Sequence, residues 1–440
     1  MTDSPRLLIV AEDDRLAGPL AAGLARLAWP AEVVRGAEAA QAAAARLPLD
    51  AALVDLAGAA PALLTLPSRL KPAAAPRRLP VVALARPEPA LEPLGFDLAL
   101  APSLHPTQAA LRLDALMRLS VAEEEAELRA ETFGAAGRAP TSSQREEGPL
   151  AVLTVGEPAP KFLALRHALA EAGADVTGAF TAYTAFDYLH DRSFDAVVLW
   201  AGEVHAEALS IAAGMRRNTR LFHTPTLLYL RHGAEVALTE AFNKGLSDVA
   251  DADTREADTA ERVLWLARSH RRERAIRATL DAMRGSGLMD AASGLFTRAL
   301  FAQHLSRLAA ASRERRRPLS VGVLRLAPRG AALAARSGGW LDKAAPQIGS
   351  MLGRLVRAED TPARLSPDVF AMALPAARRE AAQAAAERIA AVIACTAFDG
   401  AEGEPPFTVE FDIGAAEVRE GENPVAALER AATLAQGRAA

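Results

Sequence analysis

The stretch Arg357-Ala-Glu-Asp360, followed by Arg364-Leu-Ser-Pro-Asp-Val-Phe370, decides how the C-terminal third of the chain is interpreted. It places an arginine and an aspartate three residues apart, around the expected end of a helix and just before an apolar strand at 369–374. An arginine donates paired hydrogen bonds to anionic or base-edge acceptors, and a carboxylate accepts hydrogen bonds. The pair therefore fits a ligand site, but an Arg-x-x-Asp alone also fits a surface ion pair worth under about 1 kcal/mol.

The chain of 440 residues is long enough for three domains. Short apolar runs alternate with helical patterns twice, which predicts two α/β domains with parallel sheets; the runs are 6–10, 51–55, 79–84, 150–155, 194–199 and 224–230. A Gly-, Ala-, Ser- and charge-rich stretch between the two sets predicts a linker. We expect domains at 1–132 and 149–258, a linker at 133–148, a connecting helix at 259–287, and a third domain at 288–440 with an antiparallel sheet.

Composition excludes several classes of protein. The net charge of −4 argues against a bulk nucleic-acid binder. The single cysteine, Cys395, excludes an internal disulfide framework. No stretch approaches the roughly 20 apolar residues that span a bilayer, and the N-terminus does not read as a signal peptide. We expect a soluble, cytoplasmic protein without membrane insertion.

The C-terminal region resembles the GGDEF family of diguanylate cyclases. The segment Asp290-Ala-Ala-Ser-Gly-Leu-Phe-Thr-Arg298 is similar to the family's opening motif, and Asp360 stands five residues before the position of the Gly-Gly-Asp/Glu-Glu-Phe hairpin. The resemblance implies a nucleotidyl-cyclase-like α/β fold. It also implies that Arg357 and Asp360 form the family's inhibitory site for cyclic di-GMP, where an arginine recognises guanine or phosphate and a carboxylate accepts from guanine. Arg388 matches an arginine that completes this site, although a charge on a solvated helix explains it equally well.

The positions of the cyclase active site are degenerate in this sequence. The hairpin reads Ser366-Pro367-Asp368-Val369-Phe370, and Arg325 stands where the family carries a metal-binding acid. Proline removes a backbone donor and glycine's close approach to phosphate is lost, while two-metal phosphoryl transfer requires all the parts together. We therefore expect no cyclase activity; the alternative is a residual cyclase that uses Asp368 and Asp342.

The first half resembles a response-regulator receiver domain. Glu12 and Asp13 follow the first expected strand as candidate Mg²⁺ ligands, and Asp55 ends another strand as a candidate phosphoacceptor. The switch hydroxyl position falls on Ala85 and the lysine position near Ala101, so the usual switching groups are missing. Phosphorylation of Asp55 as the main input stays open as an alternative.

The second half lacks these acids. Its first strand is followed by Gly156-Glu-Pro158, and the phosphoacceptor position falls on Trp200 or a neighbour. Tryptophan cannot accept a phosphoryl group, so we expect a degenerate pseudo-receiver that serves packing or dimerisation.

By resemblance, the order of receiver, pseudo-receiver and GGDEF domain implies a cyclic di-GMP effector without cyclase activity. The resemblance further implies a homodimer, localisation at the cell pole, and partners among protease adaptors and cell-cycle regulators whose turnover by ClpXP it would couple to the second messenger. A purely structural scaffold with both sites vestigial remains a further alternative.

Overall fold

The computed structural model describes residues 6–12, 14–56, 61–85, 89–100, 105–138, 148–202, 205–283, 287–327, 338, 340–399 and 406–437. The chain divides into two compact units: unit 1 contains residues 1–120 and 146–272, and unit 2 contains residues 121–145 and 273–440. Two long helices, α5 (Pro106–Ala135) and α10 (Glu256–Ala282), contribute residues to both units.

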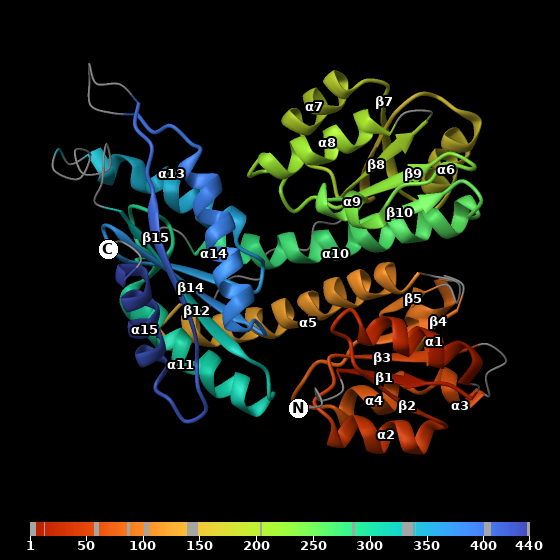
Figure 1. The fold of residues 1–440 in the computed structure, drawn as a ribbon, viewed down its shortest axis with the longest axis horizontal. Coiled ribbons are helices and arrows are strands. Elements are labelled where there is room, and N and C mark those ends of the chain that lie inside the picture. Colours follow the sequence, from red (N-terminus) through yellow and green to blue (C-terminus); the bar gives the residue numbers. More distant parts are fainter. Residues whose placement is uncertain are drawn as a thin grey trace. The chain divides into compact units, whose positions relative to one another are not determined.

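The first domain of unit 1 is a parallel sheet in the order β2-β1-β3-β4-β5, with helices between the strands (Figure 1). The strands are β1 (Leu7–Val10), β2 (Ala31–Val34), β3 (Ala51–Asp55), β4 (Val81–Leu84) and β5 (Leu98–Leu100). The helices are α1 (Asp14–Ala25), α2 (Ala37–Arg46), α3 (Pro61–Leu64), α4 (Pro67–Ala73), a 3₁₀ turn at Pro89–Leu94, and the start of α5. Strands β1, β3 and β4 are buried throughout, which explains why their sequences are continuous apolar runs.

The second domain of unit 1 repeats this topology as β10-β9-β8-β6-β7, again with every pairing parallel. Its strands are β6 (Ala151–Val155), β7 (Asp175–Ala179), β8 (Ala196–Ala201), β9 (Thr226–Leu230) and β10 (Asp248–Asp251). Its helices are α6 (Pro160–Glu171), α7 (Ala182–Asp191), α8 (Ala206–Arg217), α9 (Leu238–Asn243) and α10. In both domains the strands therefore follow the order 2-1-3-4-5, which is that of flavodoxin-like folds. The prediction of two tandem receiver-like parallel domains is thus confirmed.

A buried ion cluster lies within unit 1 on Asp248, the first residue of β10. Its carboxylate accepts hydrogen bonds from Arg112 on α5 at 2.6 Å and from Arg262 on α10 at 2.8 and 3.0 Å. Burial alone would raise the pKa of Asp248, but the two guanidinium groups outweigh it and hold that pKa below its ordinary value. Burial also lowers the pKa of Arg112 to about 10.

Unit 2 contains a mixed sheet in the order β11-β13-β14-β12-β15, in which β11–β13 is parallel and the other pairs are antiparallel. Its strands are β11 (Phe296–Thr297), β12 (Leu319–Leu326), β13 (Thr361–Ser366), β14 (Val369–Pro375) and β15 (Phe411–Glu417). Its helices are α11 (Arg298–Glu314), α13 (Trp340–Leu355), α14 (Arg379–Ala394) and α15 (Pro424–Gly437), together with the ends of α5 and α10. Small residues let α15 approach the sheet closely: a Cβ on Gly414 would lie 2.1 Å from the Ala431 carbonyl oxygen. The expected α/β fold with an antiparallel sheet is confirmed.

The sequence-based linker differs from the structure at its start. Helix α5 continues to Ala135, so the expected boundary between residues 132 and 133 falls inside a helix. Phe133 is fully buried and lies with its ring centroid 5.4 Å from that of Phe296. This aromatic contact explains why the helix continues, because it buries apolar surface that a solvated linker would expose. Residues 139–147 of the expected linker lie outside the described residues.

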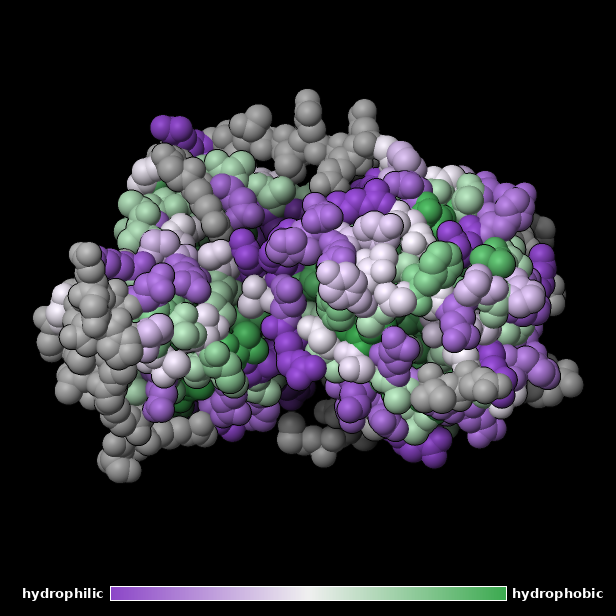
Figure 2. All heavy atoms as spheres, turned by 90° about the horizontal axis from the view of Figure 1, so that it is seen from above, coloured by the Kyte–Doolittle hydropathy of each residue, from purple (hydrophilic) through white to green (hydrophobic). Residues whose placement is uncertain are grey.

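Figure 2 shows hydrophilic residues across the drawn face, with apolar residues in small patches between them. Among the helices that the structure describes, none combines the length and the apolarity that a membrane crossing demands.

Candidate ligand site and its surroundings

The Arg-x-x-Asp segment forms a closed turn between α13 and β13. The Asp360 amide donates to the Arg357 carbonyl at 3.2 Å, and the Arg357 amide donates to Asp360 Oδ2 at 3.0 Å. Aspartate side chains stabilise turns in this way by accepting a backbone hydrogen bond. The spacing of three residues therefore fixes a local structure, and the structure brings the two predicted residues together.

The side chains of this turn differ in their access to solvent. Arg357 keeps 40% of its side-chain surface exposed, whereas the residues Glu359 and Asp360 are each 4% exposed. Arg357 Nη1 lies 3.9 Å from Glu359 Oε1. The turn thus presents a guanidinium to solvent above two buried acids, as a site for an anionic or base-edge ligand would require.

The buried acids have unusual proton affinity. Burial and the neighbouring Asp360 together raise the pKa of Glu359 to about 7, against the opposing attraction of Arg357. Burial also raises the pKa of Asp360, against the attraction of Arg357, Arg129 and Arg277. Arg277 on α10 is half-buried, and burial lowers its pKa although Glu273, Glu359 and Asp360 act in the opposite direction. Two acids and three guanidinium groups therefore share one poorly solvated region of unit 2.

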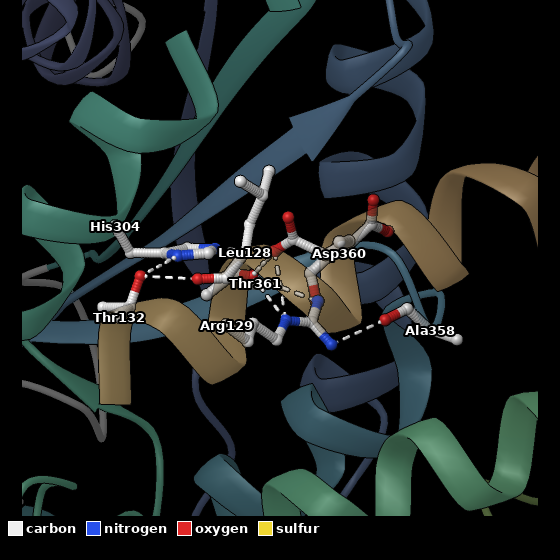
Figure 3. Close-up of polar contacts among 8 residues, drawn as sticks. Leu128, Arg129, Thr132, His304, Ala358, Asp360 and Thr361 are labelled. Carbon is white, nitrogen blue, oxygen red and sulfur yellow. Dashed lines mark hydrogen bonds and ion pairs between the residues drawn. The ribbon is translucent and has the colours of Figure 1, made fainter. Parts of the chain in front are cut away.

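The C-terminal part of α5 holds the turn from its buried side (Figure 3). Arg129 Nη1 donates to the Ala358 carbonyl at 2.8 Å and Nη2 donates to the Asp360 carbonyl at 3.0 Å. Its Nε and Nη2 also donate to Thr361 Oγ1 at 3.2 and 3.1 Å. Glu125 Oε1 accepts from Arg129 Nε at 3.1 Å and from Thr361 Oγ1 at 2.7 Å. Sequence reasoning missed these residues; the available signal was polar side chains at helical spacing, residues 125, 129 and 132, next to an apolar Phe133.

The third predicted ligand residue, Arg388, is exposed on α14. Helix α14 packs against α13, the helix that leads into the turn. Its role toward a ligand remains a prediction.

The hairpin that follows the turn has a shift of register between Arg364 and Ser366, and its turn lacks a glycine. Ser366 on β13 pairs with Val369 on β14, with Pro367 and Asp368 between them. Ser366 Oγ donates to Asp368 Oδ1 at 2.8 Å, and Arg364 Nη2 donates to the Pro367 carbonyl at 3.1 Å. The Asp368 carboxylate therefore accepts a bond from within the hairpin itself.

Arg325 lies on β12, which is flanked by β14 and β15 in the sheet. Its register partners are Val369 on β14 and Asp412 on β15. A guanidinium beside the hairpin would repel a metal ion placed there, because like charges repel strongly at contact distance in a partly dry site. Within the described residues, no group of three or more His, Cys, Asp or Glu side chains is arranged to hold a metal ion.

In the first parallel domain, Asp55 is the last residue of β3 and is 7% exposed. Glu12 follows the adjacent strand β1 and is exposed, and β1 pairs with β3 in parallel. Carboxyl ends of parallel strands meet at one edge of a sheet, so the sheet brings both acids to the same edge. Asp13 lies outside the described residues.

The register of the second parallel domain identifies its counterpart of Asp55. Val10 at the end of β1 pairs with Val54, the residue before Asp55, and Val155 at the end of β6 pairs with Leu199, the residue before Trp200. The Trp200 ring is stacked on that of Phe162, with centroids 5.5 Å apart. An aromatic packing contact therefore occupies the acid's position.

The comparisons with known proteins agree with this architecture. Residues 287–437 match the family model of the diguanylate cyclase GGDEF domain. The C-terminal part of the chain is thus a GGDEF domain, preceded by two parallel α/β domains of receiver-like topology. A search of curated proteins found no match.

Solved structures with similar folds cover parts of the chain. The FimX GGDEF domain from Pseudomonas aeruginosa is 20% identical, with a TM-score of 0.32, and the match covers 34% of this chain and 93% of that one. The GGDEF domain of DgcB from Caulobacter crescentus, in complex with cyclic di-GMP, is 20% identical with a TM-score of 0.32, covering 34% and 86%. A putative response regulator from Chloroflexus aurantiacus is 18% identical with a TM-score of 0.25, covering 27% and 98%.

Proposed function

We propose that this protein is a cyclic di-GMP effector that binds the dinucleotide at Arg357 and Asp360 and has no cyclase activity. The observation that carries the proposal is the contrast within one domain. The Arg-x-x-Asp turn is fully formed, whereas the neighbouring catalytic positions hold Arg325 and Pro367. Arg388 is the third proposed ligand residue.

The absence of cyclase activity follows from the chemistry of phosphoryl transfer. That reaction needs carboxylates to hold metal ions and a backbone that approaches the phosphates closely. Arg325 contributes a cation on β12, and the Pro367–Asp368 turn lacks glycine. Ser366 and Val369 replace the remaining hairpin residues. A residual cyclase built on Asp368 is the alternative that an activity assay tests.

Ligand binding would act on other proteins by favouring one arrangement of the domains over another. The chain resembles PopA, a non-cyclase relative of the cyclase PleD. By that resemblance we propose a homodimer at the cell pole that couples cyclic di-GMP to ClpXP-mediated turnover of cell-cycle regulators through a protease adaptor. The proposed modules are residues 1–132, 149–258 and 288–440, with a linker at 133–148 and a connecting helix at 259–287.

The test is calorimetric titration of cyclic di-GMP into the full chain and two arginine variants. Arg357→Ala removes the exposed guanidinium of the turn. Arg354→Ala is the matched control, because that arginine is exposed one helical turn earlier on α13. We expect micromolar or tighter binding by the wild type and by Arg354→Ala, and at least a tenfold loss in Arg357→Ala.

A parallel incubation with GTP and Mg²⁺ or Mn²⁺ tests the enzyme alternative. We expect no cyclic di-GMP to form. Failure of the wild type to bind cyclic di-GMP would remove the receptor proposal, and product formation would replace it by a residual cyclase.

A second input is proposed at Asp55, because the sheet brings this buried acid to the same edge as Glu12. Asp13 is the further proposed Mg²⁺ ligand there. The variant Asp55→Asn should abolish labelling by acetyl phosphate and leave the affinity for cyclic di-GMP unchanged. Loss of function in cells on Asp55→Asn but not on Arg357→Ala would instead make phosphorylation the main signal.

A further inference from the structure

The turn that carries Arg357 and Asp360 is attached to a helix that lies outside the matched GGDEF range. Arg129 belongs to α5, more than 150 residues before that range begins at residue 287. Two hydrogen bonds within the turn join Arg357 and Asp360 to each other. The carbonyl groups of Ala358 and Asp360 receive their side-chain hydrogen bonds from Arg129.

The geometry of these contacts demands an arginine. A guanidinium presents several N–H donors in a rigid planar fork, whereas a lysine offers one compact charge on a flexible stem. Arg129 uses separate nitrogens for the two carbonyls and bonds to the Thr361 hydroxyl as well. These bonds fix the backbone on both sides of Glu359, which lies between the two carbonyl-bearing residues.

Buried partners on two elements hold Arg129 itself in place. The side chains of Arg129 and Glu125 are 4% and 1% exposed. Glu125 Oε1 lies 2.6 Å from Nε2 of the fully buried His304 on α11, and His304 Nδ1 lies 2.9 Å from Thr132 Oγ1 (Figure 3). Burial would raise the pKa of Glu125, but His304 and Arg129 outweigh it and hold that pKa below its ordinary value. The carboxylate is therefore ionised and anchors Arg129 by charge.

We propose that Arg129 is a positioning residue of the cyclic di-GMP site, which keeps the Arg357–Asp360 turn in its binding conformation without contacting the ligand. This inference rests on the proposed function of that turn. The complete ligand site is therefore assembled from the GGDEF domain and α5 together, and the state of α5 sets the affinity.

The expected magnitude follows from the population of the formed turn. An apparent dissociation constant equals the intrinsic one divided by the fraction of molecules in the competent conformation. If loss of the guanidinium fork lowers that fraction to about one tenth, affinity falls about tenfold. A variant that destabilises α5 elsewhere should not produce this loss.

The experiment uses the full chain and three variants. Arg129→Lys keeps the charge and removes the fork, and Thr361→Val removes the hydroxyl that Arg129 and Glu125 share. Glu124→Gln is the matched control, because Glu124 is also buried on α5 but pairs with Arg317 at 2.6 Å rather than with the turn. Calorimetric titration gives the affinity for cyclic di-GMP, thermal unfolding gives stability, and hydrogen exchange of the Arg357 and Asp360 amides gives the order of the turn.

We expect Arg129→Lys and Thr361→Val to lose at least tenfold in affinity and in amide protection at the turn. Glu124→Gln should lower the melting temperature about as much as Arg129→Lys does, and it should bind cyclic di-GMP within twofold of the wild type. If the wild type binds, an unchanged affinity in Arg129→Lys would overturn the positioning role alone. An equal loss of affinity in Glu124→Gln would do the same. If the wild type does not bind, the proposed function fails, and amide exchange then tests only whether Arg129 orders the turn. Unchanged protection in Arg129→Lys would overturn that ordering, and a tenfold loss would support it.

Discussion

The buried glutamate of the ligand turn makes the stability of unit 2 depend on pH in a direction opposite to that of most carboxylates. Burial and the adjacent Asp360 raise the pKa of Glu359 from its ordinary value of 4.5 to about 7. Replacing it by glutamine keeps the shape of the protonated acid and removes the titration. The variant Glu359→Gln therefore isolates this one proton.

The sign and size follow from linkage between proton binding and folding. Between pH 4.5 and about 7 the folded protein keeps the Glu359 proton while the unfolded chain releases it, so the free energy of unfolding falls as pH rises. Each unit of pKa shift corresponds to about 1.4 kcal/mol. The full difference is about 3 kcal/mol, absent below pH 4.5 and complete above pH 7.

The assay is native-state hydrogen exchange at pH 5 and pH 8, read at the amides of β12, β13 and β14, which reports the opening of this unit separately from unit 1. We expect Glu359→Gln to differ from the wild type by less than about 1 kcal/mol at pH 5 and to be more stable by about 3 kcal/mol at pH 8. The control is Glu314→Gln, an exposed glutamate on α11, which should show no difference at either pH.

The same difference between wild type and Glu359→Gln at both pH values would refute the reasoning. It would mean that the folded protein ionises Glu359 as readily as the unfolded chain does. In that case Arg357 and Arg277 neutralise the acid more strongly than burial penalises it.

Two further predictions concern unit 1. The variant Asp248→Asn should cost about 3–5 kcal/mol at pH 7, because it leaves two arginines facing an uncharged group in a buried cluster. Because the folded protein holds the pKa of Asp248 below its ordinary value of 3.8, the stability that this carboxylate contributes is present above that value and is lost as the pH falls further. Hydrogen exchange at β9 and β10 at pH 7 and pH 3 measures this stability. An equal loss of stability in Asp248→Asn at both pH values would contradict the prediction. The variant Gly156→Ala should lower the melting temperature strongly, because its φ is +140° and a Cβ there would lie 2.6 Å from that of Trp200. Gly148→Ala, with φ of +130° and open space around it, separates backbone strain from that clash, and equal losses in both would exclude a role for the tryptophan.

The parallel domains could be predicted from sequence because their strands are buried on both faces. Burial makes each strand a continuous apolar run, as in Leu7–Val10 and Ala51–Asp55, and such runs separated by helices imply a parallel sheet. The counterpart of Asp55 could also be predicted as Trp200 or a neighbour, because the strands of the second domain repeat the spacing of those in the first. The pairing of β6 with β8 ends one residue before Trp200, as the pairing of β1 with β3 ends one residue before Asp55.

The attachment of α5 to unit 2 could not be predicted in the same way. Glu124, Glu125 and Arg129 are charged, and charges on a helix usually indicate a solvated face. Here they are buried because each finds a partner far away in sequence, and such pairing leaves no periodic apolar signal. The closed Arg357–Asp360 turn, by contrast, follows from local chemistry, since the aspartate accepts from a backbone amide three residues before it.

The Arg129 contacts also bear on how such proteins can be recombined. A chimera that transplants residues 287–437 onto another sensor would carry the loop but leave behind the guanidinium that braces it. Such a graft should fold around its own sheet and still respond poorly to nucleotide unless the recipient helix supplies a glutamate and an arginine four residues apart. For this chain, a segment that is moved into a chimera together with its supporting contacts begins on α5.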